Sequence, residues 1–242
     1  MSERQKMRDP KNLLSDLINK ARAFVFDMDG VLVDSEKHHF LAHQRALGEY
    51  GIAIDKSFYI THGVSTDPAL FYVKAFNQKK LSLEDAESIV IRKRQLYREL
   101  QKEEGIVPIK PAVALVKALD KKKIPLAVAS AVPQEVVKRI IKELKVERCF
   151  SVIVAGDDVP LRNKPFPDIY LQVAERLGVP PAYCIAIEDS GNGAHAALGA
   201  GMSCVVVPND YTRSHDFGGA FVFQTFTEVE KIIITNYELS RG

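Results

Sequence analysis

The stretch Ala23-Phe-Val-Phe26, followed by Asp27-Met-Asp29-Gly30, decides the fold. Its four apolar residues run directly into a carboxylate, a pattern typical of a strand that is buried on both faces of a parallel sheet. Side chains two residues apart in an extended segment face the same way, so we expect Asp27 and Asp29 to point into one pocket, with Gly30 permitting the turn that follows. Two carboxylates this close repel each other unless a cation or a shared proton relieves them.

Apolar runs indicate five further strands, the last of them weakly, at residues 125–129, 151–155, 183–187, 203–207 and 220–223. Helical patterns separate most of these runs, at residues 111–122, 134–145 and 168–177, and Gly178 is a suitable stop for the last helix. Strands that alternate with helices of this length predict an α/β fold built on a doubly wound parallel sheet. Such sheets bind ligands at the carboxyl ends of their strands.

The region between the first and second strands has no comparable apolar run. Residues 38–50, 68–77 and 82–104 have helical patterns, and Ser82 with Asp85 forms a plausible capping box. An all-helical block at this place in an α/β sheet is most simply an inserted cap domain. We therefore predict a core of residues 1–36 and 106–242 and a cap of residues 37–105, with hinges near residues 35–39 and 105–111.

Composition excludes several functional classes. The 242 residues carry 33 basic and 31 acidic side chains, a net charge of +2 without a block of one sign, so nothing favours a nucleic-acid or membrane-surface partner. The apolar runs are too short to span a bilayer, and the polar start of the chain predicts a cytoplasmic protein. Four apolar residues there predict an amphipathic helix packed on the body: Leu13, Leu14, Leu17 and Ile18. The three cysteines have no metal-ligand spacing and are expected to be small core residues: Cys149, Cys184 and Cys204.

A second acidic pair, Glu188-Asp189, ends another apolar run and leads into Ser190-Gly-Asn-Gly193. Asp189 or Ser190 could simply cap the helix that starts there. In a parallel sheet, however, this strand end lies at the same edge as Asp27, and several carboxylates at one edge call for a cation. Oxygen ligands with no neighbouring His or Cys favour Mg²⁺ over zinc.

Two more residues have the right chemistry at the right places. Ser130 follows the second strand and can donate to a phosphate oxygen, and Lys164 supplies a positive charge beside the acidic residues. The combination suits phosphoryl transfer, because an aspartate is ionised at neutral pH and needs no base to act as a nucleophile. Mg²⁺ and Lys164 would offset its repulsion from the phosphate, and a second carboxyl group can move the protons.

Four segments, residues 27–35, 129–130, 164–168 and 188–193, resemble the ordered motifs of the haloacid dehalogenase superfamily of hydrolases. The similarity runs from Ala23 to Val207. The helical insert and the first motif look like the subgroup of β-phosphoglucomutases and sugar-phosphate phosphatases, which implies a Rossmann-like core with a helical cap.

By position, the resemblance implies that Asp27 is the nucleophile, that Asp29 is the acid and base, and that Ser130 and Lys164 bind the phosphoryl group. It further implies a Mg²⁺ site formed by Asp27, the Asp29 carbonyl and Asp189, with Glu188 adding a ligand or pairing with Lys164. True dehalogenases lack the second aspartate and the metal, so Asp29 argues against dehalogenation.

On the cap side, His39, Ser65 and Lys93 resemble substrate-binding residues of the subgroup, although the run at residues 92–94 is by itself typical of a solvated helix face. The mutases carry an arginine after the Gly-Val-Ser segment, where this chain has Thr66. We therefore expect a Mg²⁺-dependent phosphatase that acts on a small phosphate monoester, a sugar phosphate, as a monomer or weak dimer. A phosphosugar mutase and a binding protein without turnover remain the alternatives.

Overall fold

The computed structural model describes residues 10–64, 71–72, 82–157 and 162–239. Its centre is a six-stranded sheet in which every pairing is parallel, in the order β3-β2-β1-β4-β5-β6. The predicted α/β class and doubly wound sheet are confirmed, and all six apolar runs contain a strand: β1 (Ala23–Phe26), β2 (Leu126–Ala129), β3 (Val152–Val154), β4 (Cys184–Glu188), β5 (Ser203–Val206) and β6 (Phe221–Val222).

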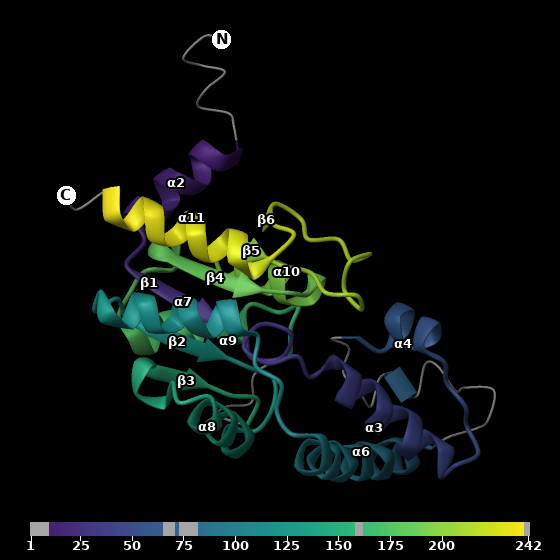
Figure 1. Cartoon of the computed structure of the whole chain (residues 1–242). Helices are drawn as coiled ribbons and strands as arrows, with labels where there is room; N and C mark the ends of the chain where they lie inside the picture. The colour runs from purple at the N-terminus through teal and green to yellow at the C-terminus, as the bar shows by residue number, and fades with distance from the viewer. Residues whose placement is uncertain (1–9, 65–70, 73–81, 158–161, 240–242) are drawn as a thin grey trace.

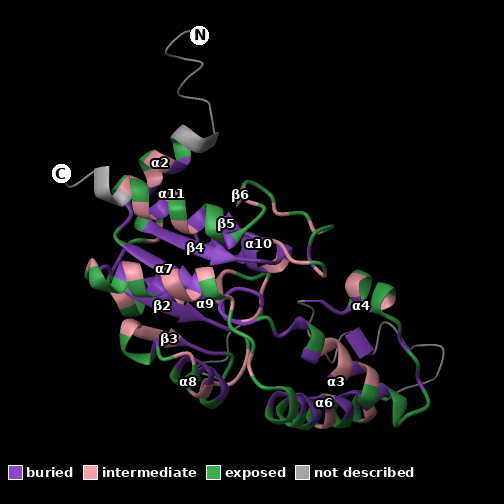
Figure 2. Cartoon of the chain, in the orientation of Figure 1, coloured by how far each residue is buried: buried purple, intermediate pink, exposed green. Residues whose placement is uncertain are grey.

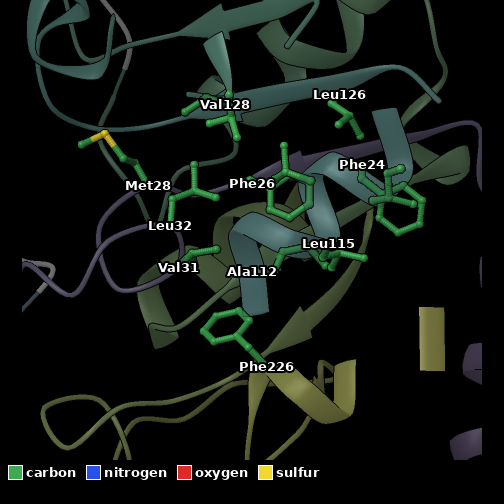
Figure 3. Packing of buried hydrophobic residues seen from close by; sticks show 14 of the residues in the cluster. Phe24, Phe26, Met28, Val31, Leu32, Ala112, Leu115, Leu126, Val128 and Phe226 are labelled. Carbon is green, nitrogen blue, oxygen red and sulfur yellow. The ribbon is translucent and has the colours of Figure 1, made fainter. Parts of the chain in front are cut away.

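The two faces of the sheet are covered by different helices (Figure 1). Phe24 and Phe26 of β1 belong to one apolar cluster, while Ala23 and Val25 belong to the other, because side chains alternate along a strand. Figure 3 shows the first cluster, in which Phe26 lies among residues of β2 and α7. Its helices are α2 (Pro10–Lys20), α7 (Lys110–Lys121), α8 (Gln134–Glu143) and α11 (Phe226–Leu239). The second cluster is covered by α9 (Asp168–Leu177) and α10 (Gly191–Gly199).

Most of the predicted details of this core are confirmed. Cys184 and Cys204 are buried, and Gly178 ends α9 in the left-handed conformation at a φ of 64°. The amphipathic helix before β1 is α2, but Leu13 is 49% exposed and does not share the buried face, so that part of the prediction is wrong. Helix α11 and the short 3₁₀ helices η2 (Glu147–Cys149) and η3 (Pro181–Tyr183) were not predicted.

Between β1 and α7 the described residues form helices, as the absence of an apolar run predicts: α3 (Glu36–Gly48), α4 (Lys56–His62) and α6 (Leu83–Glu104). The predicted capping box of Ser82 and Asp85 is present at the start of α6. These helices share an apolar cluster of their own, separate from the two sheet clusters, and Figure 2 shows them grouped to one side of the sheet. Helix α4 was not predicted, and the helix expected at residues 68–77 falls mostly outside the described residues.

The chain enters and leaves this helical region at adjacent points. The backbone N–H of Asp34 donates to the carbonyl of Val107 over 2.9 Å, and Val33 forms an antiparallel bridge with Pro108. This places the first turns of α3 and the last turns of α6 beside the carboxyl ends of the strands (Figure 1). Among the helices of the described ranges, none has the length and apolar character that crossing a membrane requires.

Candidate active site

A cavity of about 250 Å³ lies between the carboxyl edge of the sheet and the helical region. Asp27 and Asp29 reach it from the end of β1, and Asp189 from the end of β4, because parallel strands end at a common edge. Lys164 reaches it from the loop before α9. The helical region contributes Glu36, His39, His43, Tyr59, Gly63, Lys93, Arg94, Tyr97 and Arg98 to the walls.

Lys164 lies between two carboxylates. Its ammonium nitrogen is 2.7 Å from Asp27 Oδ1 and 2.7 Å from Glu188 Oε1, and it also donates to the Ala129 carbonyl over 3.2 Å. Glu188 is wholly buried and accepts a further hydrogen bond from the Tyr170 hydroxyl. Burial alone would lower the pKa of Lys164, but the charges of Asp27 and Glu188 outweigh it and raise that pKa above its ordinary value. Lys164 therefore stays protonated at neutral pH.

Asp27, Glu188 and Asp189 form an acidic cluster in which one oxygen from each residue lies within 4.8 Å of the others. Burial raises the pKa of Asp27 to about 8, with Glu188 and Asp29 adding to the shift and Lys164 opposing it. Burial, Glu188 and Asp27 likewise hold the pKa of Asp189 well above its ordinary value. One ammonium group thus does not balance three buried carboxylates, and without a bound cation Asp27 is mostly protonated at neutral pH, contrary to the ionised state that the sequence predicts. The donors are all carboxylate oxygens, the kind that Mg²⁺ prefers, so the cluster fits that ion.

Asp29 is held apart from this cluster although it follows Asp27 by two residues. Its Oδ1 accepts from Ser35 Oγ over 2.5 Å and from the Tyr97 hydroxyl over 3.2 Å, and it lies 3.3 Å from His39 Nε2. Burial acts to raise the pKa of Asp29, but the hydrogen bonds and the charge of His39 lower it overall. Two of these partners belong to the helical region, which therefore touches the carboxylate directly.

His39 and Lys93 line the cavity as a pair. Lys93 Nζ is 2.7 Å from His39 Nδ1, and the His39 ring stacks on Tyr97 with the ring centres 4.2 Å apart. Lys93 is 7% exposed, so the prediction that it lies on a solvated helix face, made from its basic neighbours, is wrong. Burial lowers the pKa of Lys93 to about 8, although Glu36 and Asp29 act in the opposite direction.

This low pKa gives a testable pH dependence. Because the pKa of Lys93 is about 8 in the folded state against 10.5 in the unfolded state, the unfolded chain binds more protons between these values, and folding becomes more favourable as pH rises through them. The free energy of unfolding of the wild type minus that of Lys93→Met should rise by about 3 kcal/mol from pH 7 to pH 11. Urea unfolding at a series of pH values measures it. The exposed Lys102→Met on the same helix is the control and should show no such rise; a flat difference for Lys93→Met would contradict the assigned burial.

The remaining predicted residues lie as follows. Ser130 comes directly after β2 and is buried, with its Oγ accepting from the Val132 N–H over 3.4 Å. Neither Ser130 nor Glu188 is among the described residues that line the cavity. Ser65 falls outside the described residues. Of the two residues considered as the cap of α10, Ser190 is the one that caps it, by accepting from the Gly193 N–H over 3.2 Å.

Sequence reasoning missed four residues that donate to the carboxylates: Ser35, Tyr97, Tyr170 and Asn209. Tyr97 donates to Asp29, and it lies one helical turn after Lys93, so that spacing could have indicated it. Asn209 Nδ2 donates to Asp189 Oδ2 over 2.8 Å. It follows the end of β5 at the same sheet edge, so the rule that located Asp27 and Asp189 applies to it as well.

Known proteins resemble this chain in sequence and in structure. The chain is 36% identical over 182 residues to the phosphorylated carbohydrates phosphatase of Thermotoga maritima, which covers 74% of this chain and 82% of the relative. It is 31% identical over 184 residues to the fructose-1-phosphate phosphatase YqaB of Escherichia coli, covering 76% and 94% of the two chains.

Among solved structures, a variant of CbbY from Rhodobacter sphaeroides in complex with xylulose-(1,5)bisphosphate superposes with a TM-score of 0.77 at 30% identity, covering 86% of this chain and 96% of that one. The β-phosphoglucomutase of Clostridium difficile has a TM-score of 0.74 at 25% identity, with coverages of 90% and 98%. The family model of haloacid dehalogenase-like hydrolases matches residues 21–201. Since that match takes in the sheet edge, the helical region and the acidic cluster, the chain belongs to the haloacid dehalogenase-like hydrolase family, as its four motifs predict.

Proposed function

We propose that this hydrolase is a Mg²⁺-dependent phosphatase that cleaves a small phosphate monoester, a sugar phosphate, through a phospho-aspartyl intermediate on Asp27. The observation that carries the proposal is the position of Lys164, 2.7 Å from Asp27 and 2.7 Å from Glu188, beside an acidic cluster that opens into the cavity. Relatives named as phosphatases of phosphorylated carbohydrates and of fructose 1-phosphate support the substrate class.

In the first step an Asp27 oxygen forms a bond to phosphorus and the bond from phosphorus to the ester oxygen breaks. Asp29, once protonated, gives its proton to the leaving oxygen. In the second step Asp29 takes a proton from water, whose oxygen attacks phosphorus and releases phosphate from Asp27. Lys164 and Ser130 hold the phosphoryl oxygens.

Asp27, the Asp29 carbonyl and Asp189 would hold the magnesium ion, and Glu188 keeps Lys164 in place. When bound, the ion supplies positive charge that offsets the repulsion between the Asp27 carboxylate and the phosphate oxygens. Contacts with Ser35, His39 and Tyr97 favour the ionised form of Asp29, and this form is the one that acts as a base in the second step.

We assign residues 1–36 and 106–242 to a catalytic core and residues 37–105 to a cap that covers it. The cap would exclude bulk water while the phosphoryl group is transferred. His39 and Lys93 are the cap residues that we assign to substrate contact, since both line the cavity. Ser65 is assigned to the same role on the family resemblance alone.

Removal of the metal should abolish the activity. Treatment with EDTA is expected to stop phosphate release from sugar phosphates, and added Mg²⁺ should restore it, because Lys164 alone does not neutralise the acidic cluster. A panel of sugar phosphates, phosphoglycolate and nucleotides, assayed for free phosphate with and without Mg²⁺, measures this. Undiminished turnover in EDTA would contradict the assignment of Mg²⁺.

A phosphosugar mutase is the second candidate, because the β-phosphoglucomutase of Clostridium difficile has the same fold. Such an enzyme would interconvert sugar phosphates without releasing phosphate, so the same panel, followed by phosphorus NMR, separates the two activities. Thr66 at the position of the mutases' arginine favours the phosphatase. Ligand binding with neither reaction would identify the binding protein instead.

A further inference from the structure

The turn after β5, residues 208–213, touches both the acidic cluster and the helical region. Its backbone is fixed by Asn209: the carbonyl of Asn209 accepts from the N–H groups of Thr212 and Arg213 over 3.2 and 3.0 Å. The Asn209 N–H in turn donates to Thr212 Oγ1 over 3.0 Å, and Thr212 is fully buried. The turn is therefore well defined at the point where its side chains reach the site.

The amide of Asn209 can lie in one orientation only. Its Oδ1 accepts from the Tyr211 N–H over 2.8 Å, while its Nδ2 donates to Asp189 Oδ2 over 2.8 Å. A flipped amide would set oxygen against the carboxylate and NH₂ against the N–H, and both contacts would be repulsive. The turn thus directs a fixed donor at one oxygen of Asp189.

That donor determines which Asp189 oxygen is available. Oδ2 is occupied by Asn209 and lies against Gly30, where a side chain would not fit because a Cβ would come within 2.2 Å of this oxygen. No described residue donates to the other oxygen, Oδ1, and Asp189 lines the cavity. Outer hydrogen bonds of this kind orient carboxylates that bind metals.

The same turn is fixed to the helical region by Tyr211. The ammonium group of Lys56 lies 4.3 Å from the centre of the Tyr211 ring, and the Tyr59 ring meets it edge to face at 6.1 Å. Lys56 and Tyr59 both belong to α4, and the Tyr59 hydroxyl donates to the cavity residue Glu36 over 2.5 Å. A single residue, Asp210, separates Asn209, which contacts Asp189, from Tyr211, which contacts α4.

We propose that Asn209 is a positioning residue that orients Asp189 for the metal ion, and that Tyr211 makes this orientation depend on the docking of α4. The proposal rests on the ion site of the proposed function but not on the reaction. Ion binding and docking of the helical region then favour each other, because a coupling between two binding events acts equally in both directions.

The test is the affinity of the full chain for Mg²⁺ without substrate, measured by isothermal titration calorimetry. Asn209→Ala is expected to weaken binding by about 10- to 100-fold, the range found when outer partners of metal ligands are removed. Asn236→Ala is the matched control: Asn236 Nδ2 also makes one hydrogen bond of 2.8 Å, to the carbonyl of Ile232 in α11. It should bind Mg²⁺ as the wild type does.

Tyr211→Leu, which touches no carboxylate, is expected to weaken Mg²⁺ binding by about fivefold, at the low end of typical couplings. Its matched control is Tyr183→Leu, because Tyr183 also contacts a cation, Arg22 at 5.9 Å, but lies before β4 at the opposite end of that strand. Thermal unfolding of each variant without metal separates lost stability from lost affinity.

Wild-type Mg²⁺ affinity in Asn209→Ala would overturn the positioning role, and so would a wild-type chain that binds no Mg²⁺. Wild-type affinity in Tyr211→Leu would overturn the coupling to α4. Should Asn209→Ala fail to fold, Asn209→Ser serves instead, because its hydroxyl can accept from the Tyr211 N–H but is too short to reach Asp189. Phosphatase assays distinguish the two failures, because a chain that binds Mg²⁺ but releases no phosphate would contradict the proposed function and leave the positioning role of Asn209 intact.

Discussion

Asp27→Asn is expected to lower phosphate release by at least about 10⁴-fold, the scale seen when the nucleophile of an enzyme is removed. Asparagine has the shape of aspartate but carries no charge, so it forms no bond to phosphorus at a useful rate. It can still accept a hydrogen bond from Lys164 Nζ, which lies 2.7 Å from Asp27 Oδ1 in the wild type. The assay is free phosphate released from the best substrate of the panel.

The fold of Asp27→Asn should survive, and in the metal-free protein its stability should equal or exceed that of the wild type. Substitution removes one of three crowded carboxylates, and burial already raises the pKa of Asp27 to about 8. Asp16→Asn, an exposed change on α2, is the control and should keep full activity. Wild-type turnover in Asp27→Asn would remove this residue from the mechanism.

Lys164→Met is expected to destabilise the metal-free protein by about 3–5 kcal/mol, because it leaves the buried carboxylates of Asp27 and Glu188 without their common partner. Urea unfolding in EDTA measures this loss. Activity should fall by about 10²–10³-fold, since a cation that meets the transferring phosphoryl group is removed. Mg²⁺ should return part of the stability, because it neutralises the same carboxylates.

A double variant separates the two effects of Lys164. In the double variant Lys164→Met with Glu188→Gln, the buried negative charge of Glu188 is removed together with its partner. Much of the stability should therefore return while the activity stays low. Lys138→Met is the control for the lost ammonium group, because Lys138 lies exposed on α8 and, within the described ranges, donates to Gln134 alone. A Lys164→Met protein as stable as the wild type would contradict the buried ion pairs.

The sequence predicts the sheet well because a buried strand leaves a local signature. Val25 and Phe26 sit in an apolar run that ends at Asp27, and the rule that parallel strands end at one edge then brings Asp27 and Asp189 together without any knowledge of tertiary contacts. The strand positions and the meeting of Asp27 with Asp189 can both be predicted from residues within a few positions of each strand end.

What could not be predicted depends on contacts between distant segments. The basic neighbours of Lys93 in the sequence predict a solvent-exposed side chain. Its burial follows only from the packing of α6 near Asp29 and His39. Helix α4 is seven residues long, too short to show a clear apolar period. Leu13 has the same spacing signal as Leu14, and only the packed surface decides which of them is covered.

The backbone hydrogen bond between Asp34 and Val107 has a consequence for how such a protein can diversify. The chain leaves the sheet region at Asp34 and returns to it at Val107, and these two residues are hydrogen-bonded to each other. The residues between them therefore form an insertion whose two ends are adjacent. Lengthening, shortening or exchanging that insertion leaves the spacing of β1 and β2 untouched. Natural variation can therefore reshape the helical side of the cavity while Asp27, Lys164 and Asp189 keep their places at the sheet edge.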